Sequence, residues 1–173
     1  LQSASNQILK KMKRRYNVEL YQEKINNLRS LFPDLCIGVD VIVGFPGENK
    51  EVFNETYSFI KKLDISYLHV FTYSRRKNTK ADKFNFQVDS KEKKERRIIM
   101  QKLSDEKFDD FINQNIGLNR KVLFENYENG LLSGLTDNYL KIYVPGEKKH
   151  VNTIKEVKIL NYDKFIFGEM INE

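Results

Sequence analysis

Apolar and polar positions follow two different periods along the first two thirds of the chain. In some segments the apolar residues recur at helical spacing, whereas others are short apolar runs rich in β-branched and aromatic residues. The pattern predicts helices over residues 5–16, 20–32, 48–64 and 90–115, and strands over residues 35–43 and 65–74. Helices and strands that alternate in this way are typical of a parallel α/β sheet.

The predicted strands are too few for a complete sheet. Both are nearly continuous apolar runs, so each is expected to be buried on both faces, as in a sheet flanked by helices. A short third strand is expected at Leu1–Gln2. Because so few parallel strands leave a sheet edge uncovered, this part of the chain is interpreted as a piece of a larger sheet or barrel.

The pattern changes at Gly117. From Arg120 onward the chain consists of short β-like runs separated by turn signals such as Asn129-Gly130 and Pro145-Gly146. Four or five short strands in so few residues predict a small antiparallel barrel. The predicted organisation is therefore an α/β domain over 1–116 followed by an all-β domain over 117–173.

Positive charge is unevenly distributed along the chain, whose formal net charge is +6. Residues 1–118 carry 22 Lys and Arg against 16 Asp and Glu, whereas 119–173 carry 8 of each kind. The excess lies in "KKMKRR" (10–15), "RRK" (75–77) and "KEKKERR" (91–97). Clusters of this kind favour a polyanionic partner, and solvated helix faces are the alternative interpretation.

The cysteine content restricts the chemistry that the chain can carry. Cys36 is the only cysteine, which excludes an internal disulfide and indicates a reducing compartment, so a cytoplasmic location is expected. His69 and His150 lie far apart, and no metal site of recognisable spacing is present. No apolar run is long enough to cross a bilayer, and the first residues do not form a signal peptide. The chain lacks an initiator methionine and is expected to begin inside a longer protein.

A glycine-rich turn follows the first predicted strand in "GVDVIVGFPGE" (38–48). Gly44 and Gly47 permit backbone angles and close approaches that a side chain would forbid. A ligand is expected at the carboxyl ends of the parallel strands, near Gly44–Glu48 and Thr72–Arg76. The alternative is an ordinary turn from strand to helix, because phosphate-loop, nucleophile-elbow and dinucleotide-binding motifs are missing.

Four segments make the functional prediction more specific. They are "LQSASNQILKKMKRRY", "GVDVIVGFPGE", "LHVFTYSRRKNTKA" and "GLTDNYLKIYVPG". In this order and at these spacings they resemble the radical-SAM tRNA methylthiotransferases, in particular the branch that acts on N6-threonylcarbamoyladenosine. The resemblance covers nearly the whole chain. It implies the last, parallel strands of a radical-SAM (β/α) barrel, followed by a TRAM domain, which is a small OB-like RNA-binding barrel.

The resemblance also implies positions for the cofactor, S-adenosylmethionine. Its candidate site residues are Gln2, Ser3, Arg14, Val43, Gly44, Glu48, Val70 and Phe71. The glycine turn would lie beside the adenine and methionyl parts, and the main chain of the next strand would border the adenine. The first two residues match the end of the preceding barrel strand, and Arg14 matches an arginine placed near the methionyl carboxylate. A solvated helix charge is the alternative for Arg14.

The chain departs from the family pattern in three ways. Ala4 and Asn78 replace glycines, and both substitutions weaken the match only slightly. The family's three-cysteine motif for a [4Fe–4S] cluster, and three further cysteines, cannot exist in a chain with one cysteine. The resemblance therefore implies the carboxyl-terminal half of such an enzyme. This half is predicted to be inactive alone, to need the missing amino-terminal part, and to self-associate through an open sheet edge.

The second domain carries the candidate RNA-binding residues, which are Arg120, Lys121, Asn138, Tyr139 and Lys141. They combine cations for phosphates with flat or polar side chains for exposed bases. The alternative is that Tyr139 and Tyr143 are simply half-buried strand residues.

Three functions are compatible with these features. The first is a part of an enzyme that installs a methylthio group at C2 of N6-threonylcarbamoyladenosine, next to the anticodon of tRNA. The second is a free-standing RNA-binding protein with a degenerate α/β partner domain. The third is a related methylthiotransferase that modifies a ribosomal protein.

Overall fold

A computed structural model describes residues 1–171 of the chain. The chain forms two compact units, Leu1–Phe108 and Asp109–Glu173, each of which is considered by itself. The first unit is a mixed α/β structure and the second is dominated by a β-barrel.

The sheet of the first unit consists of two parallel strands, β1 (Gly38–Val43) and β2 (Tyr67–Thr72). Their register runs from Gly38 opposite Tyr67 to Val43 opposite Thr72, which confirms the predicted parallel pair. Gln2 lies along the other edge of β1: its N–H donates to the Asp40 carbonyl (2.7 Å), and its carbonyl accepts from the Ile42 N–H (2.8 Å). The third strand predicted at the start of the chain is thus present as a single parallel bridge.

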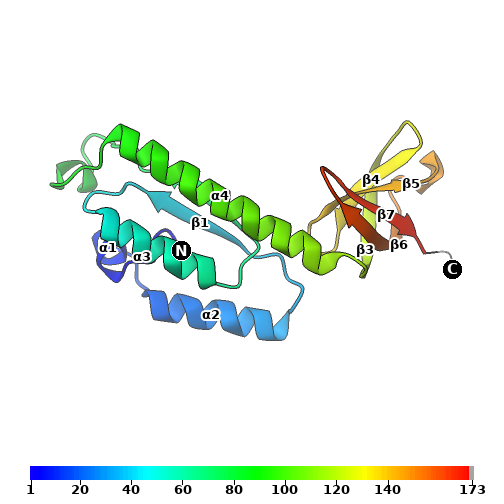
Figure 1. Cartoon of the computed structure of the whole chain (residues 1–173), viewed down its shortest axis with the longest axis horizontal. Coiled ribbons are helices and arrows are strands. Elements are labelled where there is room, and N and C mark those ends of the chain that lie inside the picture. The colour runs from blue at the N-terminus through cyan, green and yellow to red at the C-terminus, as the bar shows by residue number, and fades with distance from the viewer. Residues whose placement is uncertain (172–173) are drawn as a thin grey trace. The chain divides into compact units, whose positions relative to one another are not determined.

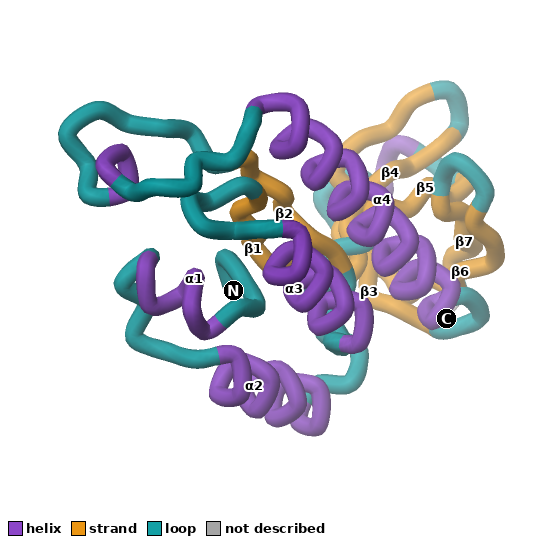
Figure 2. The backbone as a smooth tube through the Cα atoms, turned by 60° about the vertical axis from the view of Figure 1, so that its left-hand side comes forward, coloured by secondary structure: helices purple, strands orange, loops and turns teal. Residues whose placement is uncertain are grey.

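The helices are α1 (Asn6–Lys11), α2 (Val18–Leu31), α3 (Lys50–Lys62) and α4 (Ser90–Asn115), with a short 3₁₀ turn, η1 (Ala81–Lys83). Side-chain caps define where two of them begin, because Asn17 accepts from the Leu20 N–H and Asn49 from the Val52 N–H. The first helix is shorter than predicted, since the chain leaves it at Met12 and Lys13 adopts a left-handed conformation. Figure 1 and Figure 2 show α3 and α4 running alongside the β1–β2 pair.

The core of the first unit lies between this sheet and its helices. It contains Val39, Val41, Val43 and Leu68 from the strands, Ile25 from α2, Phe53 and Ile60 from α3, and Met100 and Leu103 from α4. Burial of this apolar surface is the main force that holds the unit together.

The prediction that both strands are buried on both faces is wrong. Alternate residues of β1 are buried, but Gly38 and Asp40 are exposed on the opposite face. His69 and Phe71 of β2 lie on that same face and are also exposed. Within the described residues, helices cover only one face of the sheet, and the other face exposes Phe71 together with the polar Asp40 and His69.

The outer edge of β2 also has no strand partner among residues 1–171. At this edge the Ser104 hydroxyl of α4 bonds both the N–H and the carbonyl of Leu68 (2.8 and 3.0 Å), so pairing between copies would use the part of the edge beyond Leu68. We therefore expect the average mass measured by light scattering to rise with protein concentration. The variant Phe71→Lys, which adds charge on the exposed face, should reduce this rise, and a wild-type chain that stays monomeric throughout would contradict the expectation.

The second unit contains the end of α4 and five strands: β3 (Asn119–Glu128), β4 (Leu131–Thr136), β5 (Lys141–Pro145), β6 (Ile154–Tyr162) and β7 (Ile166–Met170). They close into a barrel in the order β3-β4-β5-β7-β6, with the 3₁₀ turn η2 (Lys148–His150) before β6. The strands curl around one another in Figure 2. Asn129 and Gly130, both with positive φ, make the predicted tight turn between β3 and β4.

The barrel is mixed, so the prediction of an antiparallel barrel is wrong in one pairing. β7 forms an antiparallel pair with β6 and a parallel pair with β5, in which Ile142 lies opposite Ile166. This parallel pairing closes the barrel, because it places β7 between β5 and β6. The interior is fully apolar at its centre, where Val122, Phe124, Leu132, Leu140, Ile142, Val144, Val157 and Ile159 are completely buried.

Candidate functional site

The turn after β1 is closed by a side chain that follows it. Gly44 and Gly47 both have positive φ, +76° and +88°, which a residue with a side chain adopts only at a cost. The Glu48 carboxylate accepts a hydrogen bond from the Gly44 N–H (2.8 Å), and the Glu48 N–H donates to the Phe45 carbonyl (2.9 Å). Glu48 therefore fixes the shape of the turn at the carboxyl end of β1.

A buried arginine of α4 pairs with Glu48. One terminal nitrogen of Arg96 lies 2.6 Å from the Glu48 carboxylate and 2.8 Å from the Glu48 carbonyl oxygen. The other terminal nitrogen contacts Glu92, and the guanidinium lies 5.3 Å from the ring centre of Phe53. The side chains of Arg96 and Glu48 are only 5% and 1% exposed, so the pair is almost completely buried.

Burial raises the pKa of Glu48 above its usual value, and the Gly44 N–H and the Arg96 guanidinium partly offset this shift. Sequence reasoning missed Arg96 because it lies in a charged run. Arg96 lies four and seven residues before the buried Met100 and Leu103, which places it on the apolar stripe of α4. This spacing is the feature of the sequence that indicates its burial.

The candidate cofactor residues lie on three neighbouring backbone segments. Gln2 pairs with Val41 on one side of β1, whereas Val43 pairs with Thr72 on the other. Phe71 is 51% exposed on the uncovered face of the sheet, opposite Ile42.

The other candidate positions on these segments face the interior. Val43 and Ser3 are buried, and Val70 packs against the core of the first unit. Their side chains are therefore occupied by packing, which leaves main-chain groups as their contribution to a ligand site.

A pocket of about 390 Å³ connects Arg14 to the end of β1. Phe45 and Tyr73, whose ring centres are 5.2 Å apart, line it together with Ile42. The remaining lining residues are Lys11, Met12, Lys13, Lys80, Ala81 and Phe84. An aromatic wall with a cationic rim fits a ligand that has a flat ring and a carboxylate, as S-adenosylmethionine does. The donor set for an iron–sulfur cluster does not fit: residues 1–171 hold no group of three or more metal-binding side chains, and Cys36 precedes β1, at the end away from the turn.

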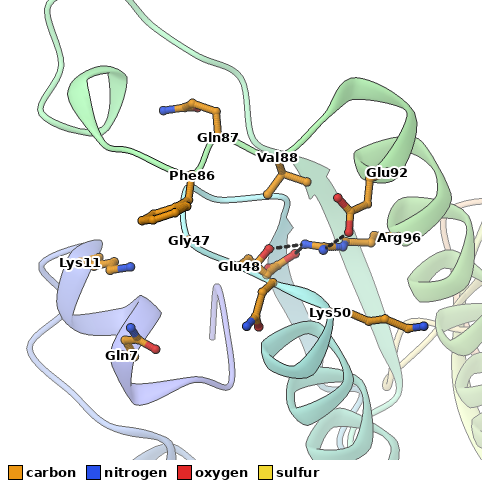
Figure 3. A pocket seen from close by; sticks show the side chains of 11 residues that line it. Gln7, Lys11, Gly47, Glu48, Lys50, Phe86, Gln87, Val88, Glu92 and Arg96 are labelled. Carbon is orange, nitrogen blue, oxygen red and sulfur yellow. Dashed lines mark hydrogen bonds and ion pairs between the residues drawn. The ribbon is translucent and has the colours of Figure 1, made fainter.

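A second and larger pocket, of about 550 Å³, lies around the same glycine turn (Figure 3). Gly47 and Glu48 form part of its wall, with Lys11 of α1 and Phe86 of the loop before α4 at its rim. Sequence reasoning did not single out Phe86, because nothing in a polar loop indicates which side chain will be exposed.

In the barrel unit, two of the five candidate RNA-binding residues are part of a buried network. The side-chain oxygen of Asn115, the last residue of α4, accepts hydrogen bonds from Arg120 (3.0 Å) and Asn138 (2.9 Å). The Thr136 hydroxyl donates to Asn138 (2.7 Å), and Asn138 is only 6% exposed. This network shapes the turn between β4 and β5.

The other three candidates are on the surface around that turn. Tyr139 is 76% exposed and has a positive φ of 67°. Lys121 is exposed on β3, and its carbonyl accepts from the Asp137 N–H (3.0 Å), so the turn lies next to it. Lys141 is exposed at the start of β5, with its ammonium 5.7 Å from the ring centre of Tyr143. The predicted set therefore divides into a surface trio and a buried pair.

The chain matches known proteins along both units. Residues 1–60 match the model of the radical SAM superfamily. A threonylcarbamoyladenosine tRNA methylthiotransferase of Bacillus subtilis is 39% identical over 92% of this chain and 37% of its own length. A protein of the same name from Aquifex aeolicus is 44% identical over 86% of the chain and 35% of its own length. A tRNA-2-methylthio-N(6)-dimethylallyladenosine synthase of Endomicrobium trichonymphae is 38% identical over 99% of the chain and 41% of its own length.

The match to the radical SAM superfamily covers the first 60 residues, about a third of the chain. The resemblance to the radical-SAM tRNA methylthiotransferases, predicted from the four motifs, is confirmed. The chain spans about two fifths of the length of these relatives. None of the helices in residues 1–171 is long and apolar enough to cross a membrane.

Proposed function

We propose that this chain is the carboxyl-terminal part of a radical-SAM methylthiotransferase that modifies an adenosine next to the anticodon of tRNA. The observation that carries the proposal is the similarity to tRNA-modifying relatives, which covers 86–99% of the chain and so includes both units. The proposed division is a cofactor-binding part over 1–116 and an RNA-binding part over 117–173.

The bound groups, S-adenosylmethionine and an iron–sulfur cluster held by residues outside this chain, would supply a radical able to abstract hydrogen from C2 of the adenosine. The residues of this chain would bind and orient the cofactor. The turn at Gly44, held in shape by Glu48, offers main-chain groups at the edge of the sheet. The main-chain groups of Val70 and Phe71 would border the adenine, and Arg14 would face the carboxylate. The chain alone is not expected to turn over substrate.

We favour N6-threonylcarbamoyladenosine as the modified nucleoside. The two relatives named for it are 39% and 44% identical to the chain, whereas those named for the dimethylallyl compound are 36–38% identical. The second candidate is therefore the dimethylallyl branch. To test this, the full-length protein is expressed in bacterial strains that lack the methylthiotransferase of either the threonylcarbamoyl or the dimethylallyl branch. Methylthiolated nucleosides in hydrolysed tRNA are then measured by mass spectrometry. Restoration of only the dimethylallyl product would contradict the proposed branch.

The barrel supports the RNA-binding role. Its five strands close in the order of an OB-like Greek-key barrel, a fold that binds oligonucleotides. The surface trio of Lys121, Tyr139 and Lys141 combines an aromatic side chain with two cations, which suits a single-stranded segment.

Replacing Tyr139 with alanine is expected to weaken binding of a tRNA anticodon stem-loop to this chain. Loss of one base-stacking contact costs about 1–3 kcal/mol, or about 5- to 150-fold in the dissociation constant. Fluorescence anisotropy of a labelled stem-loop measures the change. The control is Tyr127→Ala, because Tyr127 is an exposed tyrosine near the carboxyl end of β3. Equal effects of the two substitutions would argue against a specific role for Tyr139.

A further inference from the structure

The pocket around Gly47 has an unusual rim. Phe86 is 83% exposed, which makes its ring the most exposed aromatic side chain among the large hydrophobic residues of the described chain. Its backbone has a φ of +60°, a conformation that is unfavourable for a bulky residue. In Figure 3 the ring lies beside Gly47, with Lys11 next to it. An exposed aromatic ring on a strained backbone is stable only where neighbouring contacts hold it.

Those contacts are present. The Phe86 carbonyl accepts a hydrogen bond from the Gly47 N–H (2.9 Å), which ties the loop to the glycine turn. The side-chain amide of Gln87 donates to the carbonyls of Ala81 (3.1 Å) and Phe84 (3.0 Å), which closes the loop on itself. The ring is therefore presented to solvent by a fixed loop.

Lys11 supplies positive charge at the same rim. A side chain at Gly47 would collide with the Lys11 ammonium, so the ammonium lies directly over this glycine. Gln7, one helical turn earlier on α1, also lines the pocket. Lys11 belongs to the basic segment 10–15, so the potential around this rim favours an anion.

A ring, an ammonium and a side-chain amide around one pocket match the parts of a single nucleotide. The base can stack on the ring, the ammonium can bind the phosphate, and the amide can bond to the base edge. We propose that the pocket formed by Phe86, Lys11, Gln7 and Gly47 binds one unpaired nucleotide of the RNA substrate, separately from the Tyr139 turn. The inference rests on the proposed function, because it takes that RNA to be the tRNA loop. Single-stranded RNA is favoured over duplex because a paired base does not offer its face to the ring.

The test compares binding of a stem-loop RNA and of a blunt duplex of equal length to the 173-residue chain. We expect Phe86→Ala to weaken stem-loop binding about 5- to 150-fold and to leave duplex binding unchanged. Phe86→Tyr, which keeps a flat ring, should stay close to wild type. Lys11→Gln should make the slope of log K against log salt concentration shallower by about 1, which is the change expected when one phosphate contact is lost.

Two matched controls separate a local effect from a general one. Phe32→Ala removes another exposed phenylalanine (56%) of the first unit, and Lys62→Gln removes an exposed lysine at the end of α3. Neither substitution should change RNA binding. Hydrogen exchange of the loop over residues 81–88 checks that Phe86→Ala leaves the loop folded.

The outcomes distinguish this inference from the proposed function. If Tyr139→Ala weakens stem-loop binding but Phe86→Ala does not, the inference is overturned and the RNA-binding role stands. If the wild-type chain binds neither RNA, the RNA-binding role fails first. Equal weakening of stem-loop and duplex by Phe86→Ala, or weakening only together with loss of loop protection, would also overturn the inference.

Discussion

Replacing Arg96 with methionine is expected to destabilise the first unit by about 3–5 kcal/mol, the usual cost of removing one partner from a buried ion pair. Methionine keeps an unbranched apolar stem but removes the guanidinium that lies over Phe53, and it leaves the Glu48 carboxylate without its partner. The turn at Gly44 depends on that carboxylate, so its backbone should open as well.

The size of this effect should depend on pH. Burial already raises the pKa of Glu48, and loss of the guanidinium raises it further, so in the variant the folded state favours the protonated carboxyl. A carboxyl whose pKa is raised by folding stabilises the protein below its unfolded pKa and destabilises it as the pH rises through the folded value. The difference between variant and wild type should therefore shrink as the pH falls toward the usual pKa of glutamate.

Hydrogen exchange resolved by peptide measures the opening free energy of the first unit in wild type and variant at several pH values. Arg97→Met is the matched control, because its side chain is exposed one position further along α4. The double variant Glu48→Gln/Arg96→Met should be less destabilised than the sum of the single variants. A loss for Arg96→Met no larger than that for Arg97→Met would contradict the role assigned to the buried pair.

Replacing Gly134 with alanine is expected to disrupt the barrel, with a loss of about 3 kcal/mol or more. A β-carbon at this position would collide with the backbone of β3, lying 2.7 Å from the Leu123 carbonyl carbon and 2.9 Å from the Phe124 α-carbon. Backbone atoms cannot rotate away as a side chain can, so the β3–β4 pairing must shift. Peptides of the barrel strands should lose hydrogen-exchange protection.

Gly130→Ala is the control for the barrel. No atom lies within 4 Å of a β-carbon placed there, so the only cost is the positive φ of +82°, about 1–2 kcal/mol. If both substitutions cost the same, the close approach of the two strands at Gly134 does not restrict the residue type.

The sequence was most informative where a local pattern determines the structure. Apolar runs predicted the parallel strands, and Asn129-Gly130 predicted a tight turn because both residues tolerate positive φ. The glycine turn at Gly44 was likewise visible as a break after an apolar run. Each of these features depends on residues close together in the chain.

The errors concern interactions between distant residues. Apolar runs do not reveal that only one face of β1 is covered, because coverage depends on which helices the chain supplies. The parallel pairing of β5 with β7 depends on how the barrel closes. The burial of Asn138, a candidate RNA-binding residue, likewise depends on its hydrogen bond with Asn115, which lies far away in the sequence.

The hydrogen bond from Gly47 to Phe86 has a consequence for the order in which the first unit folds. It joins the turn after β1 to a loop that follows β2, and docking of α3 and β2 between them lowers the entropy cost of closing this connection. We therefore expect the pocket rim to consolidate after the parallel strands. A chain that emerges from the ribosome would acquire its parallel strands first and its Phe86 surface afterwards.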